Sequence, residues 1–97
     1  MSRWLLEKRL SASAERLKRL RSELQVVDEQ LGLLAEEADD LRLRALVSET
    51  PLADREHQEA QKHADAMSHH RACLVASIGA LERSQDELLD RLLSESR

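Results

Sequence analysis

An unbroken heptad repeat in the first half of the chain constrains the fold more than any other feature of the sequence. Steps of alternately four and three residues reach Leu6, Leu10, Ser13, Leu17, Leu20, Leu24, Val27, Leu31, Leu34, Ala38, Leu41, Ala45 and Ser48. Only the two serines are polar. A hydrophobic period of 3.5 residues held over this length is typical of a helix with a coiled-coil seam. The repeat predicts a helix over about residues 3–48.

The second half of the chain repeats the pattern less regularly. Its seam positions are His57, Ala60, Ala64, Met67, Arg71, Leu74, Ile78, Leu81, Gln85, Leu88 and Leu92. Between the halves, Thr50 is placed to cap a helix that starts at Pro51, the only proline. The absence of Phe and Tyr argues against β folds, which are rich in aromatic residues.

A short connection between two long helices makes them antiparallel neighbours. We therefore predict an all-α fold, an antiparallel two-helix coiled-coil hairpin, in which residues 1–97 form a single domain. The turn is expected at about residues 48–51 and the second helix over about residues 51–94. Charge supports the pairing, because residues 1–22 hold seven basic and two acidic side chains, whereas residues 82–95 hold two basic and five acidic ones.

Apolar residues away from the seam predict a further contact. The stretch Ala72–Leu81 is apolar or small on every side, and Val26, Leu33 and Val47 share the c position of the heptad. A second apolar stripe on a helix usually packs against another helix. We expect a homodimeric four-helix bundle or a docked partner helix. The candidate partner-binding residues are Val26, Leu33, Val47, Ala72, Cys73, Val75, Ala76, Ala80 and Leu89.

Residues with reactive side chains do not form a recognisable catalytic or metal motif. His57, His63, His69 and His70 include no pair four residues apart, the spacing that chelates a metal from one helix face. Cys73 lies in an apolar stretch, which favours a packing role. A hairpin offers no concave pocket in which catalytic groups converge. We expect no enzyme activity, no metal, no cofactor and no small-molecule ligand.

Charge and hydropathy also bear on partners and location. In the predicted register His69 and His70 lie near Asp28 and Glu29, so these histidines are possible pH-sensitive residues. The net charge of −4 argues against a general nucleic-acid-binding protein. Without a membrane-spanning stretch or a signal-peptide pattern, and with one cysteine, the chain is expected to be cytoplasmic and not membrane-bound.

The expected turn carries acidic residues at Glu49, Asp54 and Glu56. A coiled-coil hairpin with an acidic tip resembles the finger that bacterial transcript-cleavage factors insert into RNA polymerase. That resemblance implies carboxylates acting on the catalytic Mg²⁺. The pairs Ser13-x2-Arg16 and Ser68-x2-Arg71 are similar to part of the motif of cyclic-di-GMP-dependent anti-sigma hairpins, although the other motif positions are not matched.

These features favour a non-enzymatic protein-binding module, a small bacterial regulator or adaptor that docks a partner helix or dimerises through the face around Ala72–Leu81. One alternative is a transcription regulator that acts on RNA polymerase or a sigma factor through its hairpin and acidic tip. A second is a structural protein whose function is self-assembly.

Overall fold

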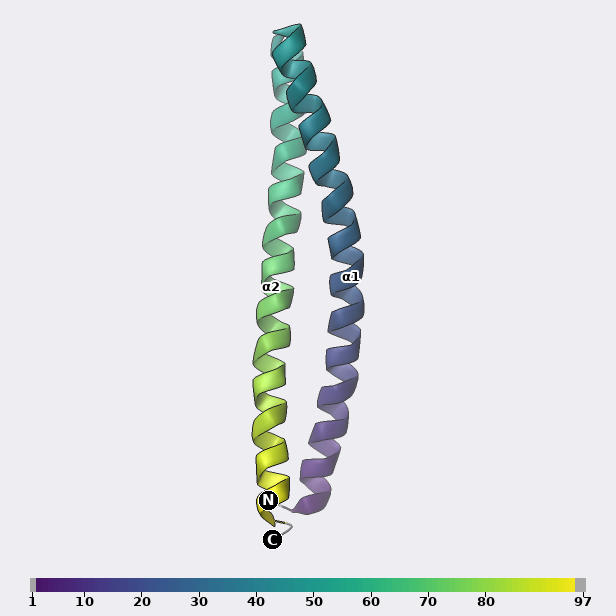
Figure 1. Ribbon diagram of the computed structural model, residues 1–97, viewed down its shortest axis with the longest axis vertical. Helices are drawn as coiled ribbons and strands as arrows, with labels where there is room; N and C mark the ends of the chain where they lie inside the picture. Colours follow the sequence, from purple (N-terminus) through teal and green to yellow (C-terminus); the bar gives the residue numbers. More distant parts are fainter. Residues whose placement is uncertain (1, 96–97) are drawn as a thin grey trace. The chain divides into compact units, whose positions relative to one another are not determined.

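The computed structural model describes residues 2–95, which form two long helices and no strand. Helix α1 comprises Arg3–Ser48 and helix α2 comprises Pro51–Glu95 (Figure 1). The predicted all-α helical hairpin is therefore confirmed. The pairing of two hairpins into a four-helix bundle stays a prediction.

The connection between the helices is formed by Glu49 and Thr50. The backbone N–H of Glu49 donates to the carbonyl oxygen of Ala45 at 3.1 Å, and Glu49 has a φ of 51°. This left-handed residue with its bond to the last turn is the αL type of helix C-cap. The Thr50 Oγ1 atom accepts from the backbone N–H of Ala53 at 3.2 Å, which caps the start of α2 at Pro51.

The chain divides into two compact units. The terminal unit contains Met1–Leu24 and Leu74–Arg97, and the connection unit contains Gln25–Cys73. In the connection unit, α1 and α2 meet at the turn near residue 50 (Figure 1). Each unit has its own part of the seam.

The terminal unit has a core of large aliphatic side chains. Its buried hydrophobic residues are Leu6, Leu17, Leu74, Ile78 and Leu88, and Leu6 is fully buried. The core also buries one hydroxyl group, that of Ser13, whose side chain is 8% exposed. All six are seam positions of the heptad pattern.

The connection unit has a thinner core. Its buried hydrophobic residues are Val27, Ala38, Ala45, Ala60 and Ala64, whereas the larger seam residues Leu31, Leu34, Leu41 and Met67 are only half-buried. Alanine removes little apolar area from water, so this core contributes less hydrophobic stabilisation than the leucine-rich core of the terminal unit. Large apolar side chains remain at its surface, including Leu33, which is 67% exposed.

Candidate protein-binding surface

The nine candidate partner-binding residues are all exposed in the structure. The connection unit contains Val26, Leu33, Val47, Ala72 and Cys73, and the terminal unit contains Val75, Ala76, Ala80 and Leu89. The stretch Ala72–Leu81, which the sequence presents as one face, is thus divided between the two units.

Heptad positions assign these residues to different sides of the helix pair. In an antiparallel pair, g positions flank g positions on one side and e positions flank e positions on the other. The ion pair between Arg21 and Glu82, 3.8 Å apart, joins two e positions in the terminal unit. Val26, Leu33 and Cys73 occupy c positions, next to the g side of the connection unit, whereas Ala72 occupies a b position next to the e side. Val26 and Leu33 therefore share a side that Ala72 does not.

The g side of the connection unit contains an apolar groove between α1 and α2. It has a volume of about 330 Å³ and is lined by Gln30, Leu33, Leu34 and Met67. Leu34 and Met67 are half-buried seam residues, and Leu33 stands at the edge, 67% exposed. We call this the apolar groove. Because three of its four lining residues are large and apolar, it is suited to an apolar side chain of a partner.

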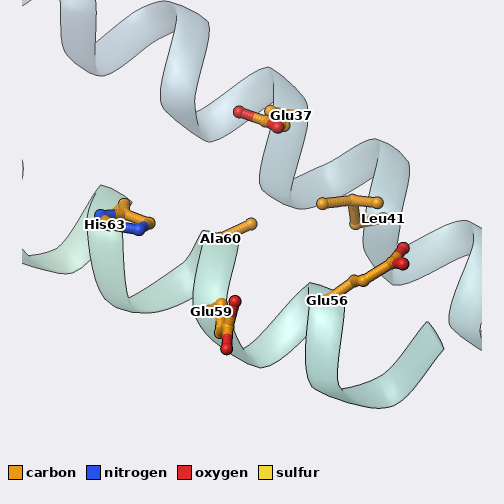
Figure 2. Close-up of a pocket in the computed structure, with 6 residues that line it drawn as sticks. All are labelled: Glu37, Leu41, Glu56, Glu59, Ala60 and His63. Carbon is orange, nitrogen blue, oxygen red and sulfur yellow. The ribbon is translucent and has the colours of Figure 1, made fainter. Parts of the chain in front are cut away.

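A second groove lies further toward the turn on the same unit. It has a volume of about 350 Å³ and is lined by Glu37, Leu41, Glu56, Glu59, Ala60 and His63. Figure 2 shows Ala60 pointing from α2 toward α1, with Glu56 reaching toward α1 near Leu41. Glu37 lies on α1, on the other side of the groove from Glu59 and His63 (Figure 2). We call this the acidic groove.

Two of the grooves of the terminal unit carry basic rather than acidic side chains. Each has a volume of about 260 Å³; one is lined by Arg9, Ala12, Ser13, Arg16, Leu81, Ser84 and Leu88, the other by Arg16, Ser77, Ala80, Leu81 and Ser84. Of the described residues, none of those lining either groove is acidic. The predicted register places the acidic residues of positions 82–95 opposite the basic residues of positions 1–22. Glu82 does pair with Arg21, but both are e residues. The arginines that line the grooves, Arg9 and Arg16, are g residues and lie on the opposite side of the helix pair.

The two possible pH-sensitive histidines are exposed, and an arginine lies beside them in the chain. Arg71 Nε donates a hydrogen bond to Asp28 Oδ1, the carboxylate that the sequence placed near these histidines. His69 Nε2 lies 3.7 Å from the sulfur of Cys73, one turn along α2. Cys73 is exposed, and a packing role for it stays a prediction. A role for His69 and His70 in pH sensing stays a prediction.

The three acidic tip residues occupy different structural positions. Glu49 forms the connection, Asp54 lies in the first turn of α2, and Glu56 lines the acidic groove. Among residues 2–95, no group of three or more His, Cys, Asp or Glu side chains is arranged to hold a metal ion.

The apolar and acidic grooves include residues that the sequence did not indicate as partner-binding. Leu34 and Met67 were assigned to the seam alone, His63 was considered only as a metal ligand, and Gln30, Glu37 and Glu59 were not singled out. The available signal was the heptad position, because Gln30, Glu37 and His63 are all g residues and therefore border the seam.

Neither described helix has a stretch long and apolar enough to span a membrane. Comparison of the chain with protein-family models, with curated proteins and with solved structures found no match.

Proposed function

We propose that the chain is a non-enzymatic protein-binding module that docks one α-helix of another protein in the apolar groove. The observation that carries this proposal is the exposure of Leu33 beside Leu34 and Met67. An amphipathic helix that lays its apolar face into a hydrophobic groove is a common mode of protein recognition. Two paired helices of this unit already supply the two walls of such a groove.

A second apolar residue extends this surface along α1. Val26 precedes Leu33 by seven residues, two helical turns, and is 52% exposed on the same side. A docked helix of about three turns would cover both residues, and each Å² of apolar area removed from water contributes about 25 cal/mol.

The test is binding of a synthetic, uncharged amphipathic peptide of about 20 residues, long enough to hold a helix. Its apolar face carries Leu at positions i, i+3, i+4 and i+7, and its other positions are Ala and Gln. Titrated into the ¹⁵N-labelled chain, it should shift the amide resonances around Leu33 and Met67. Leu33→Ser should weaken this binding about tenfold, since a buried leucine contributes about 1.5–3 kcal/mol.

The matched control is Leu43→Ser. Leu43 is 53% exposed in the same unit but occupies the f position, away from the seam. Both substitutions replace an exposed leucine, so neither is expected to unfold the helix pair. Equal weakening by the two variants, or no saturable shift at the groove, would refute the proposed docking site.

A further inference from the structure

The connection unit is strongly acidic compared with the rest of the chain. Residues 25–73 contain eleven Asp and Glu against five Lys and Arg, a net charge of −6. Residues 1–24 and 74–97 together contain eight acidic and ten basic side chains, a net charge of +2. A helix that approaches the apolar groove therefore meets a negative field, which steers and orients cationic partners.

The acidic and apolar grooves adjoin along the helix pair. On α1 the apolar groove ends at Leu34 and the acidic groove begins at Glu37, less than one turn later. On α2 the lining residues run in the opposite direction, from Met67 to Glu56. Gln30 and Leu41, the outermost residues on α1, are eleven residues apart, or about 16 Å at 1.5 Å per residue. One docked helix of about three turns would cover both grooves.

Three carboxylates line the acidic groove, contributed by Glu37, Glu56 and Glu59, and all three residues are exposed. Among the described residues that line either groove, none is Lys or Arg. Apart from His63, no basic residue therefore lines the grooves beside these carboxylates. A docked helix without basic residues would cover the carboxylates of Glu37, Glu56 and Glu59 without supplying positive charge to compensate them.

We infer that the partner helix is basic: its apolar side chains contact Leu33, Leu34 and Met67, and Lys or Arg residues one to two turns further along face Glu37, Glu56 and Glu59. This inference rests on the proposed function for the position of the docked helix and adds its charge and orientation. Charge complementarity of this kind sets which partners bind and in which direction.

A second copy of the chain complements this surface less well. Its connection unit has the same charge of −6 and would be repelled. Its terminal unit has a net charge of only +2, because the acidic side chains of residues 82–95 offset most of the basic ones of residues 1–22. A helix of another protein with unopposed basic residues fits better.

The experiment compares two versions of the amphipathic peptide with the same leucine face. One carries Lys at three positions one to two turns beyond the leucines, and the other carries Glu at those positions. We expect the basic peptide to bind about tenfold more tightly at low salt, with three exposed charge pairs each contributing a fraction of the difference. The preference should shrink at high ionic strength, where exposed charges are screened.

Two triple variants localise the effect. E37Q/E56Q/E59Q removes the carboxylates of the acidic groove, and E29Q/E36Q/D39N removes three exposed carboxylates elsewhere on α1. Both change the net charge by the same amount. The first should abolish the preference for the basic peptide, and the second should preserve most of it.

Each other outcome overturns the inference. Equal binding of the two peptides would show that charge does not select the partner, even if the uncharged peptide still binds at Leu33. An equal loss of preference in both triple variants would assign the effect to overall charge rather than to the groove. If the basic peptide shifts resonances only outside both grooves, the proposed docked position is wrong. A stable dimer that requires Leu33 would show that the occupant is a second copy.

Discussion

At the scale of single residues, Ser13 is the polar side chain that the terminal unit buries. Its Oγ atom has no hydrogen-bond partner among the described residues. A buried polar group without a partner costs about 1–3 kcal/mol. We therefore expect Ser13→Ala to raise the free energy of unfolding by about 1 kcal/mol, because it removes the hydroxyl and leaves the small side chain that the seam already accepts. Urea unfolding followed by circular dichroism measures this change.

The control for this prediction is Ser11→Ala. Ser11 is exposed on the same helix, so its replacement changes only helix propensity, by a few tenths of a kcal/mol. Ser13→Ala should stabilise the protein more than Ser11→Ala does. If the two variants have the same stability, the Ser13 hydroxyl is already satisfied in solution and is not a source of instability.

At the scale of the helices, the residue after the end of α1, Glu49, is the one non-glycine residue among residues 2–95 with a left-handed backbone conformation. Glu49 has a φ of 51°, where residues with a β-carbon are disfavoured by about 1–2 kcal/mol relative to glycine. Glu49→Gly should therefore raise the free energy of unfolding by about 1 kcal/mol, less the added entropy of the unfolded chain. Glu49→Ala removes the same carboxylate but keeps the β-carbon. Thermal unfolding of the two variants should place Glu49→Gly above Glu49→Ala, and the reverse order would contradict the αL cap.

The helices and their seam were largely predictable because they depend on local pattern. Each α1 residue at the predicted seam positions from Leu6 to Ala45 is buried or half-buried, and all other described residues of α1 are exposed. The eleven predicted seam positions of α2 are likewise buried or half-buried. Three further residues of α2 are half-buried: Ala53, Gly79 and Ser84. Ala53 continues the seam pattern four residues before His57, whereas Gly79 and Ser84 lie off the seam. A period of 3.5 residues specifies which side faces the partner helix, but not how far the burial extends beyond it.

The grooves were not predictable to the same extent, because they depend on how side chains of two helices meet. The heptad pattern assigns Leu34 and Met67 to the seam between the helices. In the structure both are only half-buried, and they line a groove beside the exposed Leu33. Arg71 reads as an interruption of the seam, yet its long side chain reaches Asp28 on the other helix. That pair has side chains 43% and 46% exposed, so it contributes little to stability. A heptad position predicts on which side of the helix a residue lies, but not which residues its side chain contacts.

At the scale of the whole molecule, the docking proposal and the self-association expected from the sequence predict different masses. Homodimerisation through the connection units would bring together two surfaces that each carry a net charge of −6. A partner helix with basic residues meets no such repulsion. The chain should therefore remain a monomer of 11.1 kDa across concentration at low salt. Size-exclusion chromatography with multi-angle light scattering at pH 7.5 measures this mass directly.

Ionic strength distinguishes docking of a basic helix from homodimerisation, because screening weakens attraction between opposite charges and also weakens repulsion between like charges. Added salt should weaken binding of the basic peptide, whereas it would strengthen any dimer that like charges oppose. We expect the mass to stay at 11.1 kDa as salt is raised, since the thin stripe of Val26 and Leu33 offers less apolar area than a stable dimer buries. A dimer of twice this mass that forms with salt, persists in Leu43→Ser and is lost in Leu33→Ser would assign the apolar groove to self-association. A mass that grows further with concentration would instead support the self-assembling structural protein.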